Sequence, residues 1–129
     1  MKLLIVRGVS GSGKSTYAKA KLVDETAMNW FWCEADQFFY QNKEKTYQFD
    51  PKFLASAHRW CRNNVENLLV MGHNVIVSNT FTRLWEYQPY LDLAKSCGAE
   101  VEIHVCKGEY KSIHAPDDVV LRQKANWEE

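Results

Sequence analysis

The stretch GVSGSGKST, residues 8–16, matches the pattern G-x-x-x-x-G-K-[ST]. It comes directly after the apolar run Leu-Leu-Ile-Val at residues 3–6, and it opens a segment, residues 14–23, that is expected to be helical. In this pattern, glycines allow backbone N–H groups to turn toward phosphate oxygens, and the amino terminus of the helix adds roughly half a positive charge. The sequence therefore predicts a phosphate-binding loop between a buried strand and a helix.

The side chains of this loop predict a nucleoside triphosphate as the ligand. We expect Lys14 to bridge the β- and γ-phosphates and the hydroxyl of Ser15 to be a ligand for Mg²⁺. ATP and Mg²⁺ are thus the expected cofactors. The residues expected to bind the nucleotide are Gly8, Ser10, Gly11, Ser12, Gly13, Lys14, Ser15 and Thr16.

The remainder of the chain alternates between expected strands and helices. We expect strands at residues 2–7, 29–35, 74–78 and 100–106, with the last of these nearer the edge, and helices at residues 14–23, 51–72, 84–97 and 116–127. Asp50 before Pro51 is typical of a helix start, and Gly98 of a left-handed helix end. This order predicts an α/β, P-loop kinase-like fold in a single domain, residues 1–129. Its parallel sheet has about four strands, helices on both faces and a short lid at residues 107–115.

The charge balance, the cysteines and the length of the apolar runs argue against several classes of protein. The 16 basic and 16 acidic side chains cancel, so the chain lacks the basic excess typical of proteins that bind long duplex nucleic acid. The four cysteines form no C-x-x-C pair and are expected to be free thiols. Because the first apolar run is too short for a signal peptide or a membrane span, we expect a cytoplasmic protein that contacts no membrane.

Acidic and polar residues follow the expected strands at the edge of the sheet where ligands bind in such folds. Asp36 follows the second strand and could be the general base that accepts the proton of an acceptor hydroxyl. The alternative is an N-cap for residues 37–39. Asn79 and Thr80 end the third strand, where many P-loop proteins place an acid; Asn79 could accept a hydrogen bond from a metal-bound water, or simply end the strand.

Phosphoryl transfer also needs positive charge on the transferring group. The candidates are Lys107 and Lys111 in the lid, Arg83 after the third strand and Arg122 in the last helix, each of which could equally be a solvated surface residue. An aromatic-rich stretch between Asp36 and the long helix could pack on the sheet or form a stacking wall for an acceptor base. Its members are Phe38, Phe39, Tyr40, Tyr47 and Phe49.

Several short motifs, taken in order, resemble the small AAA-like P-loop ATP-binding kinases, often phage-encoded, that are similar to the kinase domain of phage polynucleotide 5′-hydroxyl kinase. After the phosphate loop, the motifs that carry the resemblance are Ala35-Asp36-Gln37-Phe38-Phe39, Tyr47-Gln48-Phe49, Ala57-His58, Val77-Ser78-Asn79-Thr80, Gln88-Pro89-Tyr90 and His114-Ala115-Pro116. The likeness runs over nearly the whole chain. It implies transfer of the ATP γ-phosphate to a 5′-hydroxyl of DNA or RNA, with Asp36 as general base and a short single-stranded end as partner.

The chain departs from the pattern of these kinases at three points. Phe39 stands where the polynucleotide kinase has an arginine that clamps the acceptor, and Asn79 replaces the strand-end acid. The lid is one residue shorter than the usual His-Gly-Val-Pro and carries lysine in place of arginine. The separate phosphatase domain of larger repair enzymes is not expected in a chain of 129 residues.

Two other functions remain open from the residues alone. The neutral net charge favours a kinase of a nucleoside or another small alcohol. The missing lid arginine favours an NTP-binding module that hydrolyses slowly and acts through a partner protein, with Asp36 only capping a helix. The sequence does not decide the oligomeric state, the acceptor or the choice between ATP and GTP.

Overall fold

The computed structural model describes residues 1–23, 30–42, 44–108 and 115–129. Within these residues the strands form one parallel sheet in the order β2-β3-β1-β4. They are β1 (Lys2–Arg7), β2 (Trp30–Cys33), β3 (Asn74–Asn79) and β4 (Glu100–Val105). The prediction of a four-stranded parallel sheet with its last strand at the edge is confirmed.

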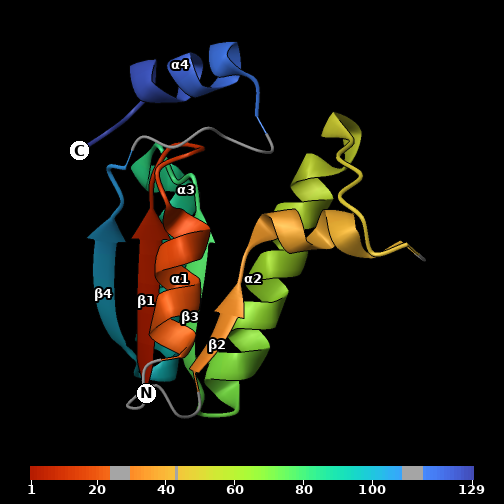
Figure 1. Ribbon diagram of the computed structural model, residues 1–129. Helices are drawn as coiled ribbons and strands as arrows, with labels where there is room; N and C mark the ends of the chain where they lie inside the picture. The colour runs from red at the N-terminus through yellow and green to blue at the C-terminus, as the bar shows by residue number, and fades with distance from the viewer. Residues whose placement is uncertain (24–29, 43, 109–114) are drawn as a thin grey trace.

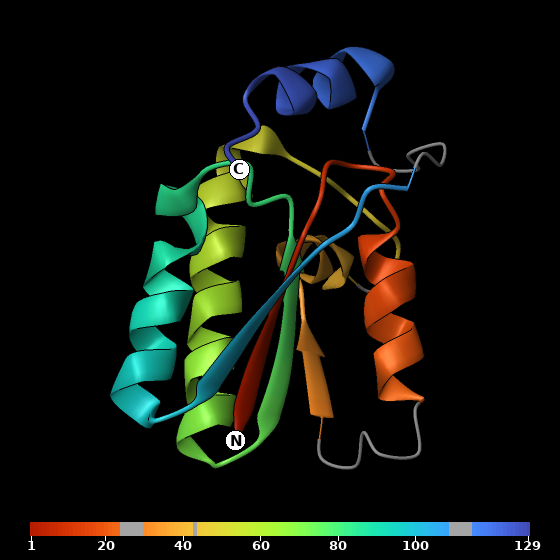
Figure 2. The ribbon, with the colours of Figure 1, turned by 90° about the vertical axis from the view of Figure 1, so that its left-hand side faces the viewer.

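Helices cover both faces of the sheet, as Figure 2 shows. The helix α1 (Lys14–Leu22) packs on one face, and α2 (Leu54–Val70) and α3 (Leu84–Cys97) pack on the other. Successive side chains of β1 therefore enter different cores: Leu3 and Ile5 lie in the cluster under α2 and α3, and Leu4 and Val6 in the cluster under α1. This burial on both faces explains why the apolar run of β1 is continuous.

The element boundaries agree closely with the expected ones, apart from the second strand. The observed strand β2 ends at Cys33, because residues 35–40 form a 3₁₀ helix, η1 (Ala35–Tyr40). The expected first residue of this strand, Asn29, lies outside the described residues. The side chain of Asp50 accepts a hydrogen bond from the backbone N–H of Lys52 (3.0 Å) and caps η2 (Pro51–Phe53), which leads into α2. Gly98 has the expected left-handed conformation, with φ 69°.

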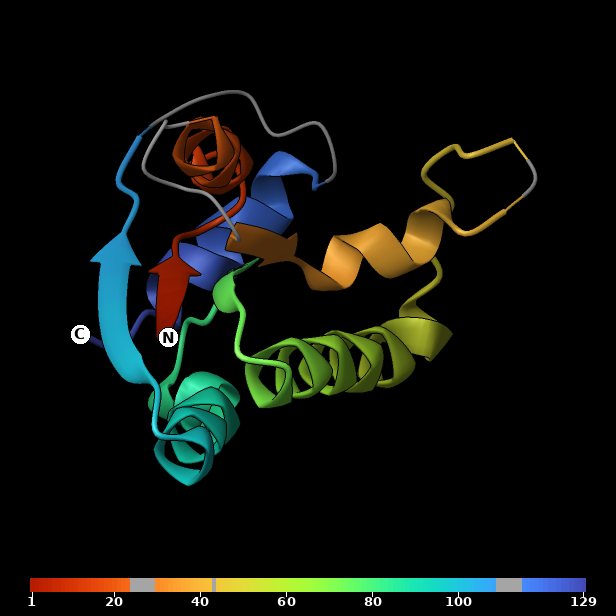
Figure 3. The same cartoon turned by 90° about the horizontal axis from the view of Figure 1, so that it is seen from below.

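Two elements surround the carboxyl ends of the strands. The last helix, α4 (Asp117–Ala125), lies across this edge of the sheet, above the turn that follows β1 (Figure 1). The helix η1 leaves the end of β2 and projects outward beside α2 (Figure 3). The carboxyl edge of the sheet is therefore bordered by α4 on top and by η1 to one side.

A buried arginine at the end of β1 attaches the C-terminal residues to the sheet. Arg7 Nε donates a hydrogen bond to the carbonyl oxygen of Phe81 (2.9 Å), and Nη2 donates to that of Glu128 (2.6 Å). Its guanidinium carbon lies 4.6 Å from the ring centroid of Tyr87 and 4.4 Å from that of Trp127. Arg7, the residue just before the phosphate loop, thus joins the end of β1 to the segment that follows α4.

Replacing Arg7 with methionine should lower the free energy of unfolding by about 3 kcal/mol, because two carbonyl oxygens lose their donor and two rings lose a cation. Urea unfolding followed by tryptophan fluorescence measures this loss. Arg7→Lys is the matched variant: it keeps the charge but cannot reach both carbonyls in one plane, so its loss should be smaller. A loss below about 0.5 kcal/mol for Arg7→Met, the size typical of a surface change, would contradict the role of this residue.

The cysteines are free thiols, two of them buried and two half-buried. Cys33 and Cys61 lie in the core on the α2 side of the sheet. Among the described residues, no helix is both long enough and apolar enough to cross a membrane.

Candidate nucleotide and metal site

The phosphate loop joins β1 to α1 in a conformation that requires glycine. Gly11 and Gly13 have φ angles of 84° and 95°, in the left-handed region that other residues rarely adopt. A Cβ on Gly8 would overlap Ser12 Oγ and would lie 3.0 Å from the carbonyl oxygen of Cys106. Gly8 N–H donates to the carbonyl oxygen of Thr80 (3.2 Å), so the end of β3 helps to hold the loop.

The side chain of Lys14 reaches back to the start of the phosphate loop. Its Nζ donates a hydrogen bond to the carbonyl oxygen of Val9 (3.0 Å). Burial lowers the pKa of Lys14, while the nearby carboxylates of Glu34 and Asp36 act in the opposite direction. A triphosphate in the loop would bring further negative charge to this ammonium group.

A carboxylate that the sequence analysis did not consider meets the expected metal ligand. Ser15 Oγ donates a hydrogen bond to Oε2 of Glu34 (3.0 Å), and Ser78 Oγ donates to the same oxygen (2.8 Å). Glu34 is only 9% exposed, and this burial raises the pKa of its carboxyl group. Hydroxyl and carboxylate oxygens are the ligand types that Mg²⁺ prefers, so the residues here fit the expected ion.

Asn79, the residue at the strand-end position, is engaged inside the protein. Its Oδ1 accepts a hydrogen bond from the backbone N–H of Ala35 (2.9 Å), and its Nδ2 donates to Cys61 Sγ (3.8 Å). These contacts tie the end of β3 to the start of η1 and to α2. The structure therefore gives Asn79 a role in joining elements, which neither interpretation of its position included, and its contact with a metal-bound water stays a prediction.

Asp36 lies in the first turn of η1, half-buried at the carboxyl edge of the sheet. Tyr47 Oη donates a hydrogen bond to Asp36 Oδ1 (3.2 Å); burial, followed by the charge of Asp36, raises the pKa of Tyr47 and keeps this donor protonated. The alternative that Asp36 caps the helix is wrong, because the N-cap is Glu34. The charge of Asp36, like that of Glu34, acts against the lowering of the Lys14 pKa by burial.

The last helix contacts the phosphate loop through a glutamine. Gln123 Oε1 accepts a hydrogen bond from the backbone N–H of Ser10 (2.7 Å), and its Nε2 donates to Ser10 Oγ (3.1 Å). The sequence did not predict this contact, because Ser10 and Gln123 are far apart in the chain. The contact explains why α4 lies above the loop.

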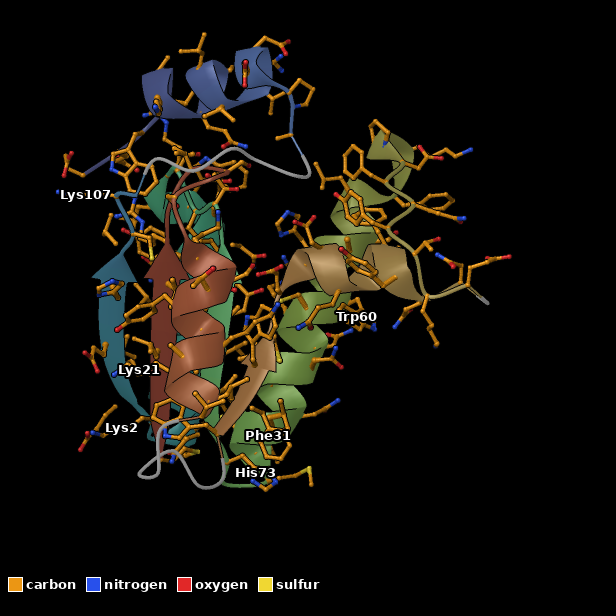
Figure 4. The ribbon with its side chains drawn as sticks, in the orientation of Figure 1. Lys2, Lys21, Phe31, Trp60, His73 and Lys107 are labelled. Atoms are coloured by element: carbon orange, nitrogen blue, oxygen red, sulfur yellow. The ribbon has the colours of Figure 1, made fainter. Side chains whose placement is uncertain are left out.

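The candidate cations differ in their placement. Arg83 is exposed at the start of α3, and the exposed Arg122 lies 3.8 Å from Asp118 on its own helix. Lys111 and His114 lie outside the described residues. Lys107 is described, and Figure 4 shows it at the upper end of the sheet, below α4.

A pocket between the phosphate loop, the end of β4 and α4 brings two lysines close to the loop. Lys107 and Lys124 line it together with Val9, Ser12 and Cys106. Lys107 and Lys124 thus add positive charge to that of Lys14 beside the loop, and Glu129, which lines the same pocket, adds negative charge. Sequence reasoning included Lys107 among the lid cations but missed Lys124.

The geometry of the loop agrees with a match to a known family. The AAA domain family pattern matches residues 3–115, from the first core residue of β1 to the end of the expected lid. The chain belongs to this family.

Relatives of this AAA domain differ widely in length. The chain is 34% identical to human NEDD4-binding protein 2 over 94 residues, which are 72% of this chain and 5% of that protein. It is 29% identical over 133 residues to an uncharacterized protein of Pasteurella multocida, covering 92% of this chain and 72% of that protein. The chain therefore spans only a small part of the human relative.

Solved structures share the fold of this AAA domain. A chain of the Pnkp1/Rnl/Hen1 RNA repair complex matches with a TM-score of 0.74 and 22% identity, over 97% of this chain and 43% of that one. The APS kinase CysC of Mycobacterium tuberculosis matches with a TM-score of 0.64 and 20% identity, over 90% of this chain and 82% of that one. A gluconokinase of Sinorhizobium meliloti matches with a TM-score of 0.57 and 16% identity, over 99% and 75%. The fold is that of P-loop kinases.

In this AAA domain the aromatic-rich stretch forms a cluster beside Asp36. The ring of Phe39 is buried and lies 5.0 Å from that of Phe49, which is 46% exposed. Phe38 packs 6.0 Å from Trp60 of α2, labelled in Figure 4 beside η1. Tyr47 lies 6.0 Å from Phe39 and also donates to Asp36. The inner rings pack, as the first of the two interpretations expected, and a stacking wall for an acceptor base stays a prediction.

Proposed function

We propose that this protein is an ATP- and Mg²⁺-dependent phosphotransferase that moves the γ-phosphate to the 5′-hydroxyl of a short single strand of DNA or RNA. The observation that carries the proposal is that Asp36 lies in the first turn of η1, two residues after Glu34, whose carboxylate accepts a hydrogen bond from Ser15 of the phosphate loop. A phosphate donor and a base for a hydroxyl acceptor can therefore be held at one site.

In this mechanism the loop holds the triphosphate and Lys14 supplies positive charge to the phosphates. Ser15 would hold Mg²⁺, and the bound ion would neutralise charge on the phosphates. Asp36 accepts the proton of the acceptor hydroxyl while the oxygen of that hydroxyl attacks the γ-phosphorus. The bond between this phosphorus and the bridging oxygen then breaks, and the oxygen leaves with ADP. Lys107 and Lys124 line the pocket beside the loop, which makes them the candidates to replace a lid arginine.

The aromatic cluster supports a nucleic-acid end as the acceptor. Tyr47 connects it directly to Asp36, and Phe49 and Tyr40 are 46% and 37% exposed, so a base could stack next to the proposed general base. Stacking contributes about 1–3 kcal/mol per base and needs no net positive charge, in agreement with a net charge of zero. The resemblance to polynucleotide 5′-hydroxyl kinase and the fold shared with a chain of an RNA repair complex point to the same acceptor.

A kinase of a nucleoside or another small alcohol is the second candidate. The neutral net charge favours it, and APS kinase and gluconokinase structures share the fold. An NTP-binding module that acts through a partner protein is the third outcome to be tested, although Asp36 does not cap η1 as that interpretation assumed.

The experiment is transfer of labelled γ-phosphate from ATP with Mg²⁺ to a 5′-hydroxyl oligonucleotide, alongside a panel of nucleosides and sugars, with Lys14→Ala as the blank. We expect label on the oligonucleotide end and no label on an oligonucleotide that already carries a 5′-phosphate. Label on a nucleoside or sugar alone would replace the proposal by the small-alcohol kinase. Binding of ATP without any labelled acceptor would leave the NTP-binding module.

A further inference from the structure

Glu34 is held at the carboxyl end of β2 by contacts from three sides. Its Oε2 accepts hydrogen bonds from Ser15 of α1 and Ser78 of β3, and its backbone N–H donates to Oε1 of Gln37 (3.2 Å). Ser78 is itself fixed, since its Oγ accepts a hydrogen bond from Trp32 Nε1 (2.8 Å). One carboxylate oxygen is therefore positioned by α1 and β3 against the hydroxyl that the phosphate-loop motif assigns to Mg²⁺.

The burial of this carboxylate lacks a full explanation from the protein alone. A buried carboxylate costs free energy unless it is paired with charge or held by several donors. Two hydroxyls donate to this carboxylate, and the opposite charge that acts on it comes from Lys14. A divalent cation beside Ser15 would supply the missing positive charge.

The position that usually carries the acid cannot supply it here. Asn79 is uncharged, and its oxygen already accepts the backbone N–H of Ala35. Glu34 directly follows β2, and β2 pairs with the first part of β3, from Trp30 opposite Asn74 to Cys33 opposite Val77. The carboxylate that follows β2 thus contacts Ser78 of β3, the residue just before Asn79.

We propose that Glu34 supplies the carboxylate of the divalent-cation site, together with the hydroxyl of Ser15, in place of an acid at position 79. This inference rests on the proposed function, because it takes ATP with Mg²⁺ as the ligand. Mg²⁺ keeps several of its waters in such sites, so the carboxylate acts on the ion or on one of these waters. The Ser78 hydroxyl would then be the group that keeps the carboxylate in place.

The inference predicts effects of opposite sign with and without metal. The test is the affinity of a non-hydrolysable ATP analogue, measured by calorimetry in EDTA and in Mg²⁺, for the wild-type protein and for Glu34→Gln. Without metal, Glu34→Gln should bind the analogue as tightly or more tightly, because a negative charge near the triphosphate is gone. Mg²⁺ should raise the affinity of the wild-type protein for the analogue, and this increase should be at least about tenfold smaller in Glu34→Gln.

Matched variants separate this effect from a loss of structure. Glu102→Gln makes the same change at an exposed position of β4 and should behave as the wild-type protein. Ser78→Ala keeps the carboxylate and should lose less of the metal-dependent gain than Glu34→Gln. A second readout is the electron paramagnetic resonance spectrum of Mn²⁺ with the analogue, in which Glu34→Gln should leave more of the Mn²⁺ unbound to protein.

The outcomes distinguish this inference from the proposed function. Equal gains from Mg²⁺ in the wild-type protein and Glu34→Gln would overturn the inference and leave the kinase proposal standing. Failure of the wild-type protein to bind the analogue would overturn both. Failure to label any acceptor would overturn the proposed phosphotransferase function but not this inference, since nucleotide and metal binding are measured without an acceptor.

Discussion

Replacing Lys14 with alanine should reduce phosphate transfer from ATP by about 10³-fold, the size of effect found when a preorganised charged or hydrogen-bonding group is removed from a transition state. The ammonium group donates a hydrogen bond to the carbonyl oxygen of Val9; burial lowers its pKa, while Glu34 and Asp36 act to raise it. Because the charge on the transferring group grows in the transition state, the loss should fall on kcat as well as on ATP affinity.

The control for this variant is Lys95→Ala, which removes an exposed lysine from the last turn of α3, away from the loop. Steady-state kinetics with varied ATP, together with thermal unfolding of each protein, separate loss of charge from loss of fold. If Lys14→Ala transferred phosphate at a rate within tenfold of the wild-type rate, another cation would have to supply the positive charge on the transferring phosphate. Lys107 and Lys124, which line the pocket beside the loop, would then be the residues to change.

The sequence predicted the loop and the sheet because both depend on local patterns. The motif at residues 8–16 requires glycines in left-handed conformations, and Gly11 and Gly13 have them. The continuous apolar run of β1 follows from burial on both faces of a parallel sheet. These features are set by a few neighbouring residues, so the printed sequence contains the information needed to find them.

Glu34 and Gln123 were missed because their roles depend on residues far away in the chain. Glu34 meets Ser78 of β3 only because β2 pairs with β3 in the observed register. Sequence reasoning looked for the acid on β3 itself, where Asn79 stands. A carboxylate directly after an expected buried strand was an available signal, but Asp36, two residues later, was taken as the more informative acid. Gln123 meets Ser10 only once α4 is placed over the loop.

Phe81 shows a further feature of the site that residue spacing does not reveal. This bulky residue is nearly fully buried and has φ 48°, in the left-handed region that bulky residues rarely adopt. Its carbonyl oxygen accepts the Arg7 Nε–H, and its ring packs 5.4 Å from that of Tyr90. These contacts hold the strained turn just after β3, where Thr80 accepts the Gly8 N–H of the phosphate loop.

Replacing Asp36 with asparagine should lower kcat for the acceptor by about 10³-fold, within the range that general base catalysis contributes. Asparagine has nearly the same shape and can still accept the hydrogen bond from Tyr47, but it cannot take a proton. Since the phosphate loop itself is unchanged, binding of the ATP analogue should stay close to that of the wild-type protein. Single-turnover transfer and calorimetry measure the two quantities separately.

Two variants decide whether Asp36 acts as a base or only as a support for η1. Tyr47→Phe removes the hydrogen bond to the carboxylate but leaves the base, so it should slow transfer far less than Asp36→Asn. Asp92→Asn makes the same chemical change on the exposed face of α3 and should leave transfer unchanged. If Asp36→Asn kept wild-type kcat, the acceptor proton would have to leave by another route. Of the two carboxylates that act on Lys14, Glu34 would be the remaining one to test.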